Sequence, residues 1–318
     1  MKHLYLIGGP MGVGKTALCR ALQQRLPNCA FLDGDWCWDM KPFFVTDETK
    51  AMVMDNICHV LNNFLQCSAF DNVLFCWVMH EQSIVDDILS RLKLRDVELH
   101  LISLTASQEA LTARLQKDVD AGLRKPEVID RSLSYLPLYE VLNTQKVDTT
   151  GKTVEEVATD VLVHFRLAAE EDAYLIATLR QQIWESTYRG IYPDDMIDHF
   201  ELEHYAQQDK EWIQNRRALV IEWAGEPCGY ILFCDGDPLI LRSLYVLSER
   251  QRQGVGKRAF ELLRQRCREI GAKTIRFQCS PWNKNALACY LHMGAVVTAR
   301  DDGHTNKAED TLWMELSL

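Results

Sequence analysis

Two glycine-rich stretches of the 318-residue chain have residue types and spacing suited to binding phosphate groups. The first covers residues 9–16 and reads GPMGVGKT, and the second covers residues 251–256 and reads QRQGVG. Each follows a short apolar run and precedes a segment with helical periodicity, so backbone N–H groups and a helix N-terminus can face anionic oxygens. Because the two patterns differ, the sequence predicts two separate sites on one polypeptide.

The first stretch has the G-x-x-x-x-G-K-[S/T] pattern of a phosphate loop between a strand and a helix. Gly9, Gly12 and Gly14 let the backbone wrap around a phosphate without side-chain clashes. Lys15 can neutralise the β- and γ-phosphates, and the Thr16 hydroxyl can ligate Mg²⁺. These residues predict ATP and Mg²⁺ as cofactors; a glycine-rich turn without a ligand is the alternative.

The next predicted strand, near residues 30–32, ends in Asp33-Gly34-Asp35. Here the first half of the chain resembles the small-molecule kinases of the P-loop class: shikimate, gluconate and adenylylsulfate kinases, chloramphenicol phosphotransferase and tunicamycin-resistance proteins. In that branch an aspartate at this strand end faces the γ-phosphate and the acceptor hydroxyl. The resemblance implies that Asp35 is the catalytic base and Asp33 a magnesium or positioning residue. Alternatively, one of these carboxylates only caps the following turn.

The polar segment 118–134 and the helix before it carry several basic residues. By the same resemblance this segment is a lid, whose arginines close over the phosphates and neutralise charge in the transition state. The expected phosphate-binding arginines are Arg114, Arg124 and Arg131. A solvated surface charge is the alternative for each of them taken singly.

The second glycine stretch belongs to a longer pattern. It follows the strand-like run 244–246, and a block of the form N-x-x-A-x-x-x-Y-x-x-x-G occupies residues 283–294. Residues 165–318 resemble the GCN5-related N-acetyltransferases (GNAT), because both blocks match the pattern of that family position by position. The resemblance implies that this half of the chain binds acetyl-CoA and transfers its acetyl group to an amine.

The same resemblance implies a role for each part of the pattern. Amides at the helix N-terminus would bind the CoA pyrophosphate, and a splayed strand would offer peptide groups to pantetheine. Tyr290 is placed to protonate the departing thiolate; a packing tyrosine in the core is the alternative. The residues expected to bind acetyl-CoA are Leu244, Val246, Arg252, Gln253, Gly254, Val255, Gly256, Lys257 and Asn283.

The general base of acetyl transfer stays open, because no carboxylate lies within residues 239–247. The candidates elsewhere are Glu185, His204, Glu222, Asp235 and Asp237. A water molecule that carries the proton is the alternative. The acidic residues between Asp194 and Glu203 either attract a cationic amine or form a solvated helix face.

Strand-like apolar runs alternate with helical patterns along the whole chain, which predicts an α/β fold. We expect a P-loop kinase domain with a three-layer α/β/α parallel sheet over residues 1–164. We expect a GNAT domain with a mixed α/β sheet over residues 165–318. A predicted helix over residues 153–165 runs almost straight into the second half, without a Gly/Ser/Pro linker.

The expected strands place both glycine stretches at strand ends. In the first half the strands cover residues 4–7, 30–32, 73–79, 99–104 and 146–148. In the second half they cover residues 218–223, 228–233, 239–247, 274–279, 295–299 and 311–316. Residues 224–227 read as a hairpin turn. Each phosphate loop therefore follows the carboxyl end of a strand and opens a helix.

Composition excludes several classes of partner. The net charge is −10 and no Lys/Arg run occurs, which disfavours nucleic acid and membrane surfaces. The eleven cysteines contain no C-x-x-C and are expected to be free thiols in a reducing compartment. We expect no secretory signal and no membrane span, since no apolar run approaches ~20 residues, and so a cytoplasmic protein.

Together these patterns predict a bifunctional group-transfer enzyme that acts on small molecules. The N-terminal domain would phosphorylate a small molecule with ATP, and the C-terminal domain would acetylate an amine with acetyl-CoA. One alternative is an acetyltransferase with a non-catalytic, regulatory nucleotide-binding domain. Another is a kinase that carries a degenerate acetyltransferase. The sequence leaves the two acceptors and the oligomeric state open.

Overall fold

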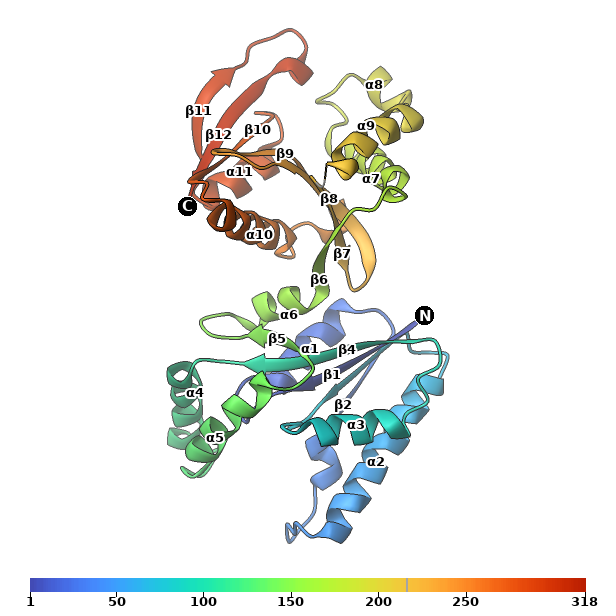
Figure 1. Ribbon diagram of the computed structural model, residues 1–318, viewed down its shortest axis with the longest axis vertical. Helices are drawn as coiled ribbons and strands as arrows, with labels where there is room; N and C mark the ends of the chain where they lie inside the picture. Colours follow the sequence, from blue (N-terminus) through green and yellow to red (C-terminus); the bar gives the residue numbers. More distant parts are fainter. Residues whose placement is uncertain (216) are drawn as a thin grey trace. The chain divides into compact units, whose positions relative to one another are not determined.

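The computed structural model describes residues 1–215 and 217–318. The chain divides into two compact units, Met1–Ala158 and Thr159–Leu318, whose elements are labelled in Figure 1. The boundary falls inside helix α6 (Val154–Leu162), whereas the sequence placed it after residue 164. The helix is shorter than expected because strand β6 (Val163–Leu167) begins at the very next residue.

The N-terminal unit is built on a five-stranded parallel sheet with the strand order β2-β3-β1-β4-β5. Consecutive residues from Leu4 to Ile7 are all buried, so both faces of the sheet are covered. This is the three-layer parallel arrangement that the sequence predicts. The strands are β1 (Lys2–Gly8), β2 (Cys29–Asp33), β3 (Asn72–Cys76), β4 (Val97–Thr105) and β5 (Gln145–Asp148).

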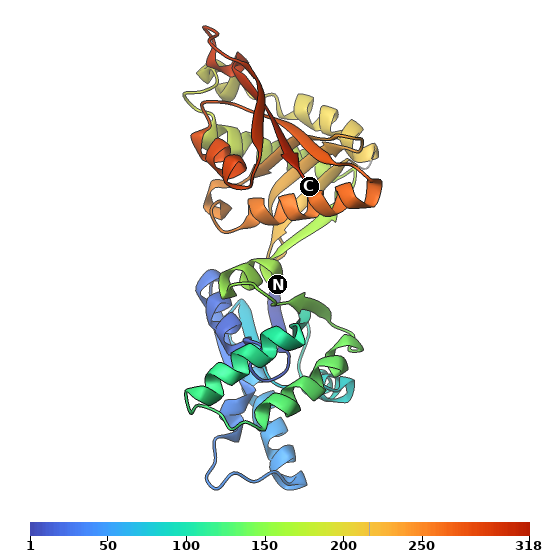
Figure 2. The same ribbon diagram turned by 90° about the vertical axis from the view of Figure 1, so that its left-hand side faces the viewer.

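The helices of this unit fill the connections between its strands. Helix α1 (Lys15–Arg25) begins inside the first glycine stretch. Helices α2 (Asp47–Gln66) and α3 (Gln82–Arg91) share a core with β1, β2 and β3. Helices α4 (Gln108–Asp120) and α5 (Val128–Glu140) lie side by side in Figures 1 and 2. The segment 118–134, expected as a lid, therefore contains the end of α4 and the first half of α5.

The C-terminal unit is built on a seven-stranded sheet with the order β11-β12-β10-β9-β8-β7-β6. Strands β9 and β10 pair in parallel, and the other neighbouring pairs are antiparallel, so the sheet is mixed as predicted. Ala224 and Gly225, with φ of 52° and 83°, form the predicted hairpin turn. The remaining strands are β7 (Ala218–Trp223), β8 (Glu226–Cys234), β9 (Leu239–Val246), β10 (Thr274–Cys279), β11 (Val296–Asp301) and β12 (Thr311–Ser317).

In the part of this unit that the structure describes, five α-helices follow β6. Helices α7 (Asp172–Thr187), α8 (Asp194–Asp198) and α9 (Leu202–Gln214) precede β7, and α7 packs against α9 and β8. Helix α10 (Val255–Ile270) connects β9 to β10 and runs along the sheet in Figure 2. Helix α11 (Lys284–His292) follows β10. Over the described ranges 1–215 and 217–318, no helix combines the length and apolar character needed to cross a membrane.

Candidate functional sites

The first glycine stretch forms a loop between β1 and α1 that requires glycine. Gly9, Gly12 and Gly14 have φ of +151°, +78° and +106°, values that L-residues with side chains rarely adopt. A Cβ on Gly12 would also lie 2.5 Å from the Leu115 side chain, whereas a Cβ on Gly14 would meet no atom within 4 Å. The loop is thus packed against α4 on one side and open on the other.

The Lys15 ammonium is folded against the loop that precedes it. It donates hydrogen bonds to the carbonyl oxygens of Gly9 at 2.9 Å and Pro10 at 3.0 Å. Burial lowers the pKa of Lys15, and the nearby carboxylates of Asp35 and Asp33 act in the opposite direction. A partly desolvated cation within a turn of backbone N–H groups is the environment that an anionic ligand needs.

Asp33 joins the loop to the end of β2. Its Oδ2 accepts a hydrogen bond from the Thr16 hydroxyl at 2.7 Å, and its Oδ1 accepts one from Asp35 N at 3.1 Å. Asp33 therefore caps the turn, as one alternative expected, and also contacts the hydroxyl expected to ligate Mg²⁺. A buried carboxylate beside a hydroxyl is an oxygen donor set that Mg²⁺ prefers, so these residues fit the ion.

Asp35 lies at the carboxyl edge of the sheet, next to this pair. Desolvation and the charge of Asp33 raise the pKa of Asp35, and the charges of Lys15 and Arg124 oppose the rise. The Trp77 indole closes one side of the turn, because a Cβ on Gly34 would lie 2.6 Å from its ring. The two aspartates and two cations thus form one electrostatically coupled group around the loop.

The three predicted phosphate-binding arginines occupy different positions. Arg114 donates to Val13 O at 3.3 Å and to the Thr149 hydroxyl at 2.9 Å, and it lines a cavity of about 220 Å³ beside the loop. Arg124 pairs with a carboxylate of α4 at 3.0 Å. Arg131 lies on α5 with its side chain exposed to solvent. Arg114 therefore contacts the loop directly, Arg124 acts on it through charge, and Arg131 faces away into solvent.

The strand before the second glycine stretch contains a β-bulge. Leu232 of β8 pairs with Ser243, but the next residue, Phe233, pairs with Leu241. Arg242 is therefore an extra residue of β9 without a partner in this ladder. A bulge bends the strand that carries it, and here it lies at the point where β9 leaves β10.

Strands β9 and β10 separate toward their carboxyl ends. Their parallel pairing covers Leu239–Leu241 and Ile275–Phe277, whereas β9 continues to Val246 and β10 to Cys279. A cleft of about 1050 Å³ opens from this gap. Peptide groups of β9 beyond the bulge are therefore available on the side that faces away from β8.

The second glycine stretch connects β9 to α10 at the edge of this cleft. Gly254 precedes the helix with φ of +86°. Gln251 Nε2 donates to Val246 O at 3.0 Å, and the Thr159 hydroxyl donates to Gln253 O at 2.9 Å. These two hydrogen bonds fix both ends of the loop, so that the first turn of α10 lines the cleft.

Most of the residues predicted to bind acetyl-CoA line the cleft, and so does Tyr290. The exception is Gln253, whose side chain donates to Glu249 O at 2.7 Å and whose carbonyl is held by Thr159. Its side chain therefore stabilises the loop from the other side. The predicted residues that line the cleft are Leu244, Val246, Arg252, Gly254, Val255, Gly256, Lys257 and Asn283.

Tyr290 lies on α11, half-buried beside the cleft. Its ring packs against Phe277 and Phe260 at centroid distances of 4.8 Å and 5.6 Å. Burial raises the pKa of Tyr290 far above its ordinary value of 10, and the phenol is protonated at neutral pH in either case. Asn283 Oδ1 accepts a hydrogen bond from Ala286 N at 3.1 Å and caps the same helix. Tyr290 thus combines the two alternatives, a packed ring and a cleft-facing position.

The groups considered for the general base do not line this cleft. Each is engaged by a neighbour elsewhere: Glu185 by Arg189, Glu222 by Arg166, Asp235 by Arg266, Asp237 by Lys273 N and His204 by Gln208. The carboxylates that do line it, in the described part of the chain, are Asp209 and Asp310. The sequence analysis singled out neither.

Asp209 is a buried carboxylate on α9. Its Oδ1 accepts a hydrogen bond from Arg180 Nη2 at 2.7 Å, and Arg180 Nε contacts the Tyr230 hydroxyl at 2.9 Å. Burial raises the pKa of Asp209, and the charge of Arg180 opposes the rise. The available sequence signal is spacing: Tyr205, Asp209 and Ile213 share one helix face, so the carboxylate interrupts an apolar stripe.

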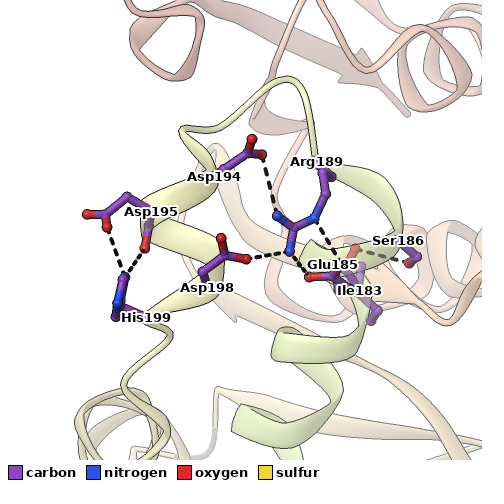
Figure 3. A network of polar contacts seen from close by, with 8 residues as sticks. All are labelled: Ile183, Glu185, Ser186, Arg189, Asp194, Asp195, Asp198 and His199. Atoms are coloured by element: carbon purple, nitrogen blue, oxygen red, sulfur yellow. Dashed lines mark hydrogen bonds and ion pairs between the residues drawn. The ribbon is translucent and has the colours of Figure 1, made fainter.

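Two of the acidic residues of α8, Asp194 and Asp198, form ion pairs with Arg189, whereas Asp195 pairs with His199. Figure 3 shows Arg189 among three carboxylates, at 2.9 Å from Glu185, 3.4 Å from Asp194 and 2.8 Å from Asp198. The guanidinium offsets part of this negative charge. The network therefore weakens the alternative in which these residues attract a cationic amine.

Asp310 organises the loop between β11 and β12. It accepts hydrogen bonds from Trp282 Nε1 at 2.8 Å, His304 N at 3.0 Å and His304 Nδ1 at 2.9 Å. The His304 N–H and the Trp282 indole lower the pKa of Asp310 to about 2, and the Asp310 carboxylate raises the pKa of His304. Because Trp282 and Asp310 both line the cleft, this loop forms one of its walls.

Solved structures similar to this chain share low sequence identity with it. The PaiA N-acetyltransferase from Thermoplasma acidophilum, in complex with coenzyme A, is 20% identical over 49% of this chain and 99% of that chain, with a TM-score of 0.43. Ard1 from Thermoplasma volcanium is 17% identical over 49% and 98%, with a TM-score of 0.39. The tunicamycin resistance protein of Deinococcus radiodurans is 22% identical over 51% and 94%, with a TM-score of 0.40. At these identities the similarities define no activity.

Two protein-family models match separate parts of the chain. Residues 6–134 match the AAA domain, and residues 177–295 match the Acetyltransferase (GNAT) family. No curated protein matches the sequence. The first match covers the phosphate loop, and the second covers the splayed strands and the second glycine stretch. The chain thus joins an N-terminal P-loop domain to a C-terminal domain of the GNAT acetyltransferase family.

Proposed function

We propose that the chain is a bifunctional group-transfer enzyme, which phosphorylates a small molecule in its P-loop domain and acetylates an amine in its GNAT domain. One observation carries the proposal: each glycine loop opens beside a group able to move a proton. That group is Asp35 at the first loop and Tyr290 at the second. When bound, ATP with Mg²⁺ would supply the phosphoryl group, and acetyl-CoA would supply the acetyl group.

In the acetylation reaction, the cleft between β9 and β10 supplies both binding and proton transfer. The first turn of α10 directs amides toward a pyrophosphate, and the edge of β9 near Leu244 and Val246 offers peptide groups to pantetheine. Asn283 lines the same cleft beside this arm. Tyr290 lines the cleft with its phenol protonated at neutral pH, so it can give a proton to the departing thiolate.

In the phosphorylation reaction, the first loop positions the triphosphate against the acceptor. Lys15 and the loop amides would hold the phosphates, and Thr16 with Asp33 would hold Mg²⁺. Asp35 orients the acceptor hydroxyl and takes its proton; the raised pKa makes its ionised form a better base. Further positive charge comes from Arg114, Arg124 and, after movement of α5, Arg131.

Two substitutions in the full chain, one in each site, test the proposal. Gly256 lines the cleft and a Cβ there meets no atom within 4 Å, so Gly256→Val should fold normally and obstruct acetyl-CoA. Gly254 is a poorer choice, since its φ is +86° and Thr159 lies 3.2 Å from the added Cβ. Lys15→Ala removes the only side-chain cation of the first glycine stretch. By calorimetry, Gly256→Val should lose acetyl-CoA binding and keep ATP binding, and Lys15→Ala should show the reverse.

Activity assays then separate the proposal from a regulatory P-loop domain. We expect ADP to accumulate only with a cognate acceptor and to disappear in Lys15→Ala, while acetyl transfer persists. ATP that alters acetyl transfer without ADP release would favour the regulatory alternative. Unchanged acetyl-CoA affinity in Gly256→Val would contradict the assignment of the second site.

A further inference from the structure

A cluster of two histidines and a glutamate lies apart from both glycine loops. His3 is the second residue of β1, and Glu98 and His100 lie near the start of β4. The parallel register pairs His3 with Glu98 and Tyr5 with His100. Residues two apart in a strand point to the same face, so all three side chains project from one face of the sheet.

The ligating atoms of these side chains already have the spacing of a metal site. His3 Nδ1 lies 3.2 Å from His100 Nε2 and 3.5 Å from Glu98 Oε2, and His100 Nε2 lies 3.8 Å from Glu98 Oε1. A tetrahedral Zn²⁺ with bonds of 2.0–2.1 Å to nitrogen and oxygen separates its ligand atoms by about 3.3 Å. The two imidazole nitrogens lie 3.2 Å apart, close to that value, and the contacts of 3.5 Å and 3.8 Å reach the two different oxygens of Glu98. With one ligand atom taken from each residue, the three atoms lie within 4.8 Å of one another.

The surroundings hold the ligands in place and leave the site accessible. The side chains of His3 and His100 are 14% and 15% exposed, and that of Glu98 is 39% exposed. The buried Tyr5 ring stacks on the His100 imidazole at 4.2 Å and 11°, which fixes the plane of that ring. A set of two imidazoles and one carboxylate favours Zn²⁺, whereas Mg²⁺ favours oxygen ligands alone.

A hydrogen bond between the two imidazoles is the simpler explanation of the shortest distance. It uses one proton between His3 Nδ1 and His100 Nε2. It does not account for the carboxylate, whose two oxygens approach the same two nitrogens. A cation shared by all three groups satisfies every one of these contacts together.

We propose that His3, Glu98 and His100 bind a divalent transition-metal ion of the Zn²⁺ type, with one coordination position left to water. The site joins the amino-terminal ends of two neighbouring strands, so bound metal should stabilise the N-terminal domain. About 20 Å of extended chain separates His3 from Gly9, where the phosphate loop begins, at ~3.3 Å per residue. The proposal is thus independent of the proposed function.

Metal titration of the full chain, freed of any histidine tag and stripped with EDTA, tests the site. Calorimetry with Zn²⁺ should detect one site that is weakened at least about tenfold in Glu98→Gln and lost in His3→Ala. Zn²⁺ should also raise the melting temperature of the wild-type protein but not of His3→Ala. His199→Ala is the matched control, since His199 lies near a single carboxylate and is 79% exposed.

Cobalt spectroscopy separates this site from the cysteine thiols. Co²⁺ in the wild-type protein should give visible bands of a nitrogen and oxygen site, and His3→Ala should abolish them. A thiolate-to-cobalt charge-transfer band, or Zn²⁺ affinity unchanged in His3→Ala and Glu98→Gln, would overturn the proposal. Glu98→Gln keeps the size of the side chain, and unchanged ATP binding would show that this variant is folded. Weakened Zn²⁺ binding by this folded variant would therefore support the proposed metal site.

Discussion

The Arg180–Asp209 pair should be far more important to stability than the Arg189 network, although both are ion pairs of the same helical region. The Arg180 and Asp209 side chains are 9% and 1% exposed, and Arg180 also contacts the Tyr230 hydroxyl. Arg189 is 38% exposed, and its partners are more exposed still. Arg180→Met leaves a buried carboxylate without its cation, a change that costs about 3–5 kcal/mol. Arg189→Met should cost at most about 1 kcal/mol, because water solvates its partners.

The pH dependence of the loss gives a sharper test than its size. Without Arg180, Asp209 avoids a buried charge by remaining protonated in the folded state. In the unfolded chain, Asp209 ionises above a pKa of about 3.9. The free energy of unfolding of the variant therefore falls by about 1.4 kcal/mol for each further pH unit. The loss in Arg180→Met should therefore be about 4 kcal/mol at pH 7 and about 1.5 kcal/mol at pH 5.

Hydrogen exchange with mass spectrometry can measure this locally in α7 and α9. Corrected for intrinsic rates, amide protection in Arg180→Met should fall about 10³-fold at pH 7 and about tenfold at pH 5. Arg180→Met combined with Asp209→Leu should restore most of the protection, because an apolar pair replaces the ions. A loss that is independent of pH, or equal in Arg189→Met, would refute the reasoning.

Three further predictions concern the two sites and the loop that walls the cleft. Tyr290→Phe should keep acetyl-CoA affinity and lower the kcat of acetyl transfer by about 10²-fold, whereas a variant that is less stable but kinetically normal would assign Tyr290 to packing only. Asp35→Asn should bind ATP normally and lose about 10²-fold or more in phosphate transfer; a nearly silent Asp35→Asn beside an inactive Asp33→Asn would reverse the two roles. The ionised Asp310 carboxylate stabilises the β11–β12 loop fully above its ordinary pKa of 3.8, and this stabilisation is lost as the pH falls toward its native pKa of about 2. The protonated His304 stabilises the loop fully below its ordinary pKa of 6.5, and this stabilisation is lost as the pH rises through its raised pKa. Amide protection in the β11–β12 loop should therefore be greatest between these limits, and a flat profile would contradict the pairing.

The parts of the sites that sequence could predict are those encoded by neighbouring residues. The first phosphate loop lies within residues 9–16, and its backbone conformation follows from its own glycines. The same holds for the second loop and for Tyr290, which belong to short patterns of fixed spacing. Local patterns predict local structure because the relevant contacts lie within a few residues of each other.

The residues that sequence reasoning missed depend on distant pairings. Arg180 and Asp209 meet through the packing of two helices, and they lie 29 positions apart. His3 and His100 are 97 positions apart and meet only because β1 and β4 pair in one register. No periodicity specifies such a register in advance. The end of α6 was misplaced for a similar reason, since β6 is defined by its pairing with β7.

The bulge at Arg242 limits the changes in length that this strand can accept during divergence. Across the antiparallel ladder, Tyr245 faces the same side as Tyr230, whereas Leu241 and Leu244 both face the opposite side. The extra residue is what brings positions 241 and 244 to one side despite their odd spacing. A substitution at Arg242 changes one side chain, but a one-residue deletion there would turn every later residue of β9 to the other face. Related sequences that keep the cleft should therefore conserve the number of residues between Leu241 and Leu244 more strictly than the residue type at position 242, which also lines the cleft.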